Sequence, residues 1–183
     1  METLNQFVAL LEGRFDNKEQ LQALQDQGIT DFPYAQHVNT VCNSKITGLP
    51  QDFPGIFLVE ESYYTTNGST HASSHLFLFT QEGEQVKLTS YELPQGSGKD
   101  FTYEAMAPVP YESLTPSEKF TPALYTQKDG VWEGGSVSMF SPVLKFTLFE
   151  RFSREVLEVS ESMEVNGRRT FGYDQPILYR RKA

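Results

Sequence analysis

The stretch Gly55-Ile56-Phe57-Leu58-Val59-Glu60-Glu61-Ser62-Tyr63-Tyr64, followed closely by Asn67-Gly68, is the part of this sequence that decides the fold. It is rich in the aromatic and β-branched residues that are typical of β-strands. An Asn-Gly pair between two such segments is the strongest short-range signal for a hairpin, because both central residues of a type I′ turn need a positive φ. We therefore predict a strand over 55–64 that turns back into a second strand over 73–80.

The two-residue alternation continues outward on both sides of this hairpin. Further strands are predicted at 36–46, 85–93, 123–127, 131–133, 144–152, 155–165, 168–173 and 177–181. The pairs Asp129-Gly130 and Asn166-Gly167 supply two more tight turns. Short turns without intervening helices favour continuous antiparallel pairing, so the sequence predicts a mainly β fold, an up-and-down antiparallel barrel of about ten strands.

Two segments depart from this pattern. Residues 1–28 are predicted to form N-terminal α-helices, because one apolar stripe recurs at helical spacing; its members are Leu4, Phe7, Val8 and Leu11. Gly13 ends this first helix, and a second is expected from Asp16 to Gly28. Residues 94–122 are rich in proline and are predicted to be a long irregular loop, a flap or partner-binding segment, with one weak strand near 101–103 as the alternative. The whole chain, 1–183, is expected to be one domain.

The composition limits the partners. The formal net charge is −9, whereas nucleic-acid binding needs a cationic surface, so we expect neither nucleic acid nor an anionic membrane as a partner. No apolar run approaches the roughly 20 residues of a spanning helix, and no signal-peptide core follows Met1. The sequence therefore predicts a cytoplasmic protein.

Histidine and cysteine do not point to a metal or a reactive thiol. His71 and His75 are four residues apart on a predicted strand, a separation of roughly 13 Å, which is too long for one metal ion. We therefore predict no metal site. Cys42 is the only cysteine, so no intrachain disulfide can form, and its apolar neighbours indicate a small buried hydrophobe.

Acidic residues on strands are the most informative polar feature. Glu60 and Glu61 are adjacent, so on a barrel strand one of them faces the interior. Glu161 likewise interrupts an apolar row of its strand. A buried carboxylate needs partners, because desolvation is costly. The partners are a ligand in the barrel or, if these acids lie near a hydrated barrel mouth, Arg151 or Arg154.

The segment Leu11–Gln20 contains the pattern L-x-G-x-F-x-N-x-x-Q. This pattern resembles the opening of the CpcT/CpeT family, the phycobiliprotein chromophore lyases that share a lipocalin-like (calycin) barrel. The resemblance continues at residues 37–42, 57–63 and 146–181, which are similar to the family's first long strand, its aromatic-rich strand and its last strands. It implies a lipocalin-like barrel over most of the chain.

The resemblance also implies an activity. The barrel would bind a bilin, a linear tetrapyrrole, as substrate and attach it to a cysteine of a phycobiliprotein, with no covalently bound cofactor. Glu60 would be the catalytic residue, hydrogen-bonding the pyrrole nitrogens and favouring the protonated bilin. Tyr63 or Tyr64, which point to opposite faces, would contact the ligand, together with His75 and Glu161.

One departure from the family pattern affects this hypothesis. The family strand that begins P-Y-R-Q-R-V carries two arginines, and the matching positions here are Ser73 and His75. Arginine binds the propionates of a bilin far better than serine does, so Arg151 or Arg154 would have to replace them.

Three functions stay open from sequence: the lyase, a non-catalytic lipocalin-like carrier of an apolar or amphipathic small molecule, and a filled barrel that binds partners through 94–122. An exposed barrel edge beside the N-terminal helices would also allow a homodimer.

Overall fold

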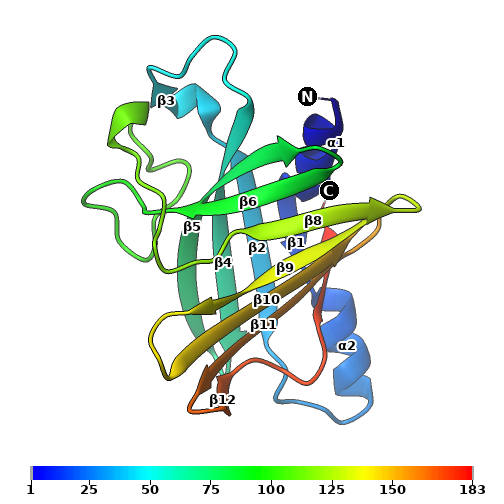
Figure 1. Cartoon of the computed structure of the whole chain (residues 1–183). Coiled ribbons are helices and arrows are strands. Elements are labelled where there is room, and N and C mark those ends of the chain that lie inside the picture. The colour runs from blue at the N-terminus through cyan, green and yellow to red at the C-terminus, as the bar shows by residue number, and fades with distance from the viewer. Residues whose placement is uncertain (1, 183) are drawn as a thin grey trace.

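The computed structural model describes residues 2–182 and confirms a mainly β fold, a closed antiparallel barrel (Figure 1). The ring consists of β1 (Gly13–Asp16), β2 (Tyr34–Val41), β4 (Gly55–Thr66), β5 (Ser69–Glu82), β6 (Gln85–Tyr91), β8 (Ala123–Lys128), β9 (Val131–Met139), β10 (Leu144–Phe152), β11 (Leu157–Val165) and β13 (Ile177–Arg181). Each of these strands pairs with the next, and β13 pairs back with β1. The predicted up-and-down order is therefore confirmed.

The remaining elements lie outside the ring. They are α1 (Glu2–Leu11), α2 (Lys18–Asp26), the 3₁₀ turns η1 (Asn43–Lys45) and η2 (Tyr111–Ser113), and the short strands β3 (Ile46–Thr47), β7 (Val109–Pro110) and β12 (Arg168–Phe171). The strand β12 forms a hairpin with β11 but does not close the ring. Figure 1 shows α1 and β12 at opposite ends of the barrel. No helix within residues 2–182 is long and apolar enough to cross a membrane.

The membership of the ring differs from the prediction, although the strand number agrees. The sequence predicts a strand at 168–173 within the barrel, but the ring instead contains β1, which was expected to be the junction of two helices. The four residues of β1 are too few to show the two-residue alternation by which a strand is predicted from sequence. This strand exists because it pairs with β2 on one side and β13 on the other. With that pairing complete, the ring has no open edge between β13 and β2.

The predicted hairpin turns have the expected backbone conformation. Asn67, Asp129 and Asn166 all have φ between 51° and 53°, and the glycine that follows each one also has a positive φ. Asparagine and aspartate tolerate this left-handed region better than other non-glycine residues do. Three turns of the barrel are therefore fixed by local sequence.

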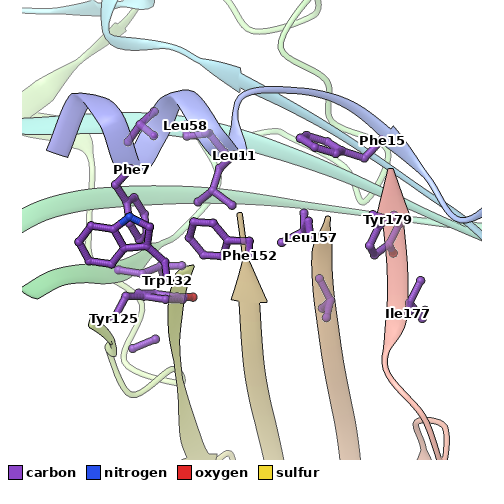
Figure 2. Packing of buried hydrophobic residues seen from close by; sticks show 14 of the residues in the cluster. Phe7, Leu11, Phe15, Leu58, Tyr125, Trp132, Phe152, Leu157, Ile177 and Tyr179 are labelled. Atoms are coloured by element: carbon purple, nitrogen blue, oxygen red, sulfur yellow. The ribbon is translucent and has the colours of Figure 1, made fainter. Parts of the chain in front are cut away.

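The helix α1 closes one end of the barrel. Its apolar stripe is buried, and Phe7 contacts four aromatic rings at centroid distances of 5.0 to 5.3 Å; they belong to Phe79, Tyr125, Trp132 and Phe152. Figure 2 shows Phe7 beside Tyr125, Trp132 and Phe152. The Arg181 guanidinium donates hydrogen bonds to the carbonyls of Ala9, Leu10 and Glu12. A cation at a helix C-terminus satisfies these free carbonyls and complements the helix dipole.

The long segment 94–122 covers the outer face of the barrel rather than standing free. Its apolar residues join a second core on the outer face of β4, β5 and β6, and this core contains Phe57 and Leu76. The Lys45 ammonium donates to backbone carbonyls of the segment, including that of Met106 at 3.0 Å. The predicted alternative of a strand near 101–103 is wrong. The segment instead forms β7, which pairs with β3.

Candidate functional site

The strand β4 separates its two acids onto opposite faces. Glu60 faces the barrel interior with Leu58 and Tyr64, whereas Glu61 faces outward. On the outer face, the Glu61 carboxylate accepts hydrogen bonds from the Tyr63 hydroxyl (2.8 Å) and from the backbone N–H of Tyr103 (3.1 Å). Glu61 therefore anchors the covering segment, and Glu60 is the acid that a ligand in the barrel can meet.

Three carboxyl groups converge in the interior from three strands. Glu60 comes from β4, Glu150 from β10 and Glu161 from β11, and Figure 1 shows β4 on the opposite side of the ring from β10 and β11. The Tyr125 hydroxyl donates to Glu150, and the Tyr64 hydroxyl donates to Glu161 at 3.1 Å. Within residues 2–182, the buried polar side chains include no lysine or arginine. The interior therefore contains three acids without a basic counterion.

Burial changes the charge of these acids. Desolvation raises the pKa of Glu60 well above its usual value, and the nearby carboxyl groups of Glu150 and Glu161 raise it further. Burial also raises the pKa of Glu150 to about 7 and raises that of Glu161. Desolvation penalises the charged form, so burial favours the protonated form of each of these carboxyl groups.

His37 lies beside Glu60 in the same interior. Its Nε2 is 3.2 Å from the Ser62 hydroxyl, its Nδ1 is 3.5 Å from a Glu60 oxygen, and its ring packs on Tyr179 at 4.4 Å. Burial lowers the pKa of His37 to about 3, so the imidazole is neutral. The contact with the protonated Glu60 is therefore not an ion pair, and Nδ1 has no hydrogen bond.

The half of the interior opposite α1 is less completely buried than the α1 half. Its inward-facing side chains are only half-buried although they lie on ring strands; they are Tyr64, His75, Phe77, Phe146, Leu148 and Glu161, and the Glu60 side chain keeps 12% of its surface accessible. We call this half the cup. Phe120, packed between Phe140 and Phe146, lies at its rim near His75. A narrow side crevice lined by Tyr64, Glu161, Phe171 and Tyr173 also reaches it.

The structure brings together some of the predicted site residues. Glu60, Tyr64, His75 and Glu161 all face the cup, and the His75 ring stacks on Phe77. Ser73, the other position at which the family has an arginine, is exposed at the rim, with its hydroxyl 3.2 Å from His75 Nε2. The geometry thus places the predicted acids and one tyrosine around one space.

Three predicted residues lie elsewhere. Tyr63 faces outward under the covering segment. Arg151 is on the outer face of β10, 3.2 Å from Glu158 and 46% exposed, and Arg154 is exposed in the turn after β10 at the α1 end. The alternative that Arg151 pairs with Glu60 or Glu161 does not hold, because adjacent strand residues face opposite sides and Glu150 takes the inward position.

Sequence reasoning missed Glu150 and His37. A signal existed for Glu150, since it alternates with the apolar residues Phe146, Leu148 and Phe152 in the same way that Glu161 alternates with its neighbours. His37 could not be found in this way. Its position opposite Ser62 depends on the register between β2 and β4, which one sequence does not reveal.

Cys42 and the other histidine do not contribute to the cup. Cys42 is buried in the outer core, and burial raises the pKa of its thiol to about 12, so it behaves as a small hydrophobe. His71 is exposed. Among residues 2–182, no three metal-ligating side chains lie close enough together to hold a metal ion.

No protein-family model, curated protein sequence or solved structure matches this chain. The resemblance to the CpcT/CpeT family therefore rests on its motif residues alone. The barrel, which is compatible with a lipocalin-like fold and with ligand binding, rests on the structure.

Proposed function

We propose that the protein binds a bilin in the cup and presents it to a cysteine of an acceptor phycobiliprotein. The observation that carries this proposal is the set of three interior carboxyl groups without a basic partner. A bilin offers several pyrrole N–H donors and becomes a cation when protonated. Hydrogen bonds from these N–H groups to Glu60 and Glu161 would compensate the carboxyl groups for the water that they lose on burial.

The attachment step needs little from the barrel except position. The acceptor cysteine's sulfur bonds to the ethylidene carbon of the bilin, the ethylidene double bond is consumed, and a proton is delivered to the adjacent ring carbon. Holding the bilin with its reactive end at the rim raises the effective concentration of the two partners. A carboxyl group near the pyrrole nitrogens favours the protonated and more electrophilic bilin. Cys42 is unsuited to be the nucleophile, because it is a buried thiol on the wrong face.

A second candidate, a non-catalytic carrier of an amphipathic small molecule, is favoured by the absence of buried arginine and lysine in residues 2–182. The propionates of a bilin would then find no partner inside the cup and would stay at the rim. A carrier needs only the half-buried aromatic wall and the acids. The two candidates share the cup and differ in whether the bound molecule is transferred.

The test is a titration of the protein with free phycocyanobilin, followed by the visible absorption band. We expect a saturable red shift that Glu60→Gln weakens, because a neutral amide stabilises the protonated bilin less than a carboxylate does. The matched control is Glu158→Gln, an acid on the outer face of β11 that should not change the titration. No shift at micromolar protein would rule out the bilin.

Transfer is measured separately. The loaded protein is mixed with an apo-phycobiliprotein, and the acceptor is analysed for a covalent bilin on denaturing gels. A covalent adduct supports the lyase, and stable binding without an adduct supports the carrier.

A further inference from the structure

We propose that the cup selects its ligand as an organic cation on a flat apolar framework and releases protons to solvent when it binds. This inference rests on the proposed function only in that both place a small molecule in the cup. It commits to a charge class rather than to a bilin. It also adds an exchange of protons for the ligand, which makes binding dependent on pH.

The first support is the geometry of the acids and their surroundings. Glu60 and Glu161 are the two acids of the cup that keep accessible surface, and the aromatic rings of Tyr64, Phe77 and Phe146 form its wall. A flat cation can stack on such rings while its N–H groups or charge meet a carboxylate. An anion would face the same acids without a basic partner.

The second support is a buried histidine beside Glu60. The His37 side chain is 3% exposed, and its Nδ1 points at Glu60 from 3.5 Å without forming a hydrogen bond. The Tyr179 ring packs on the His37 ring at 4.4 Å and is fully buried, so it fixes the orientation of this imidazole. Unsatisfied buried polar atoms are costly, so an unpartnered Nδ1 aimed at Glu60 marks a position where a bound group can add a hydrogen bond.

Proton release follows because burial favours the protonated form of the interior carboxyl groups. A carboxyl group that gives up its proton to solvent becomes the carboxylate that pairs with the cation, and no ligand bond is broken. The same environment that raises the pKa of the three carboxyl groups holds these protons until a positive charge replaces them.

The other interior groups do not mask this exchange. Titratable side chains face the interior from β2, β4, β5, β8, β10, β11 and β13; they are His37, Glu60, Tyr64, His75, Tyr125, Glu150, Glu161 and Tyr179. Burial lowers the pKa of both histidines and raises the pKa of the three tyrosines, so these histidines and tyrosines stay neutral near pH 7. On α1, β1, β6 and β9, the buried residues are apolar or bring only hydroxyl or backbone polar groups toward the interior. The exceptions are Trp132, at the α1 end of the barrel, and Asp16, the last residue of β1.

The experiment compares three flat probes of similar size by calorimetry. They are proflavine (a cation), 1-aminoanthracene (neutral at pH 7) and 1-anilinonaphthalene-8-sulfonate (an anion). We expect proflavine to bind at least about tenfold more tightly than the other two, as expected for hydrogen bonds to a charged group. Repeating the proflavine titration in phosphate and in Tris gives the number of protons released, because the two buffers differ in ionisation enthalpy.

The number of protons released on binding leads to a second expected result. If one proton leaves with each cation bound, affinity rises with pH by up to about tenfold per pH unit while the carboxyl group is protonated in the free protein. Glu60→Gln and Glu161→Gln should each reduce both the affinity for proflavine and the proton count, whereas Glu158→Gln should change neither. The wild-type comparison of probes does not depend on any variant folding.

The outcomes separate this inference from the proposed function. Equal affinity for the neutral or anionic probe, or a proton count of zero, overturns the inference even if phycocyanobilin binds. Preferential proflavine binding with proton release supports it even if phycocyanobilin fails to bind, and then only the bilin proposal fails. If none of the three probes binds, this inference fails, and the phycocyanobilin titration alone decides the proposed function.

Discussion

The two halves of the barrel interior have the same strand architecture but opposite chemistry. Toward α1, the inward side chains are aromatic and almost completely buried: Phe7, Tyr125, Trp132 and Phe152 are all at most 1% exposed. In the cup, the inward side chains include acids and remain half-buried. The difference shows that closure of a barrel does not decide whether it is filled. A helix from outside the ring covers one half, whereas the inward side chains of the other half keep accessible surface in the part of the chain that the structure describes.

The comparison also explains how the protein tolerates protonated or unpaired acids in its interior. Folding free energy comes largely from apolar burial, and the α1 half together with the outer core beneath 94–122 supplies most of that burial. The cup is then free to keep polar groups that weaken the fold but suit a ligand. Functional sites commonly hold such locally unfavourable arrangements.

The largest expected effect comes from breaking the filled half. Phe7→Ala removes the ring that contacts four others and should reduce the free energy of unfolding by about 3–5 kcal/mol, as expected for a fully buried aromatic residue. Phe171→Ala, at a ring that is 38% exposed beside the cup, is the matched control and should cost about 1 kcal/mol or less. Urea unfolding of both variants checks this. Equal losses would contradict the division of the interior.

A smaller, pH-dependent effect is expected from the acids. The folded protein keeps the Glu150 proton up to about pH 7, whereas the unfolded chain loses it near its ordinary pKa of 4.5. The protonated Glu150 carboxyl therefore contributes to the free energy of unfolding of the wild type at low pH, and this contribution is lost as the pH rises through about 7. Glu150→Gln lacks this loss, so its stability relative to wild type should rise across this window by up to about 3 kcal/mol.

Thermal unfolding of wild type and Glu150→Gln at several pH values measures that difference. The histidine contributions cancel in the comparison, because both proteins contain them. A stability difference that is constant with pH would show that Glu150 is already ionised in the folded protein.

The smallest effect concerns the contact that fixes α1. Arg181→Ala removes the hydrogen bonds to three helix carbonyls and should cost about 1–2 kcal/mol. Arg154→Ala, at an exposed arginine in a nearby turn, is the control and should be close to neutral. Hydrogen exchange of α1 amides should rise only in the first variant. The same exchange rates in both would mean that Arg181 does not hold the helix.

Much of this architecture could be predicted from local sequence. The Asn-Gly and Asp-Gly turns and the alternation of the strands define the up-and-down barrel, and the apolar stripe of α1 predicts a helix with one buried face. The same alternation predicts that Glu161 faces an apolar interior. These features depend on neighbouring residues, which a single sequence displays.

The rest depends on contacts between distant segments. The strand β1 forms only by pairing with β2 and β13, and Glu60 meets His37 only through the register of β2 against β4. Likewise, the outward position of Arg151 follows from the inward position of Glu150, a parity that the sequence analysis did not apply to β10. Site residues that share one strand were predictable, and those brought together by register were not.

The most direct test of the central claim, a closed half and an accessible ligand-binding half, is acrylamide quenching of tryptophan fluorescence. The only native tryptophan, Trp132, is 1% exposed beside α1 and should be strongly shielded. Phe77→Trp adds an indole to the cup, and we expect a second, readily quenched component that bound proflavine or phycocyanobilin protects. An added indole as shielded as Trp132, or one that no bound molecule protects, would contradict the account.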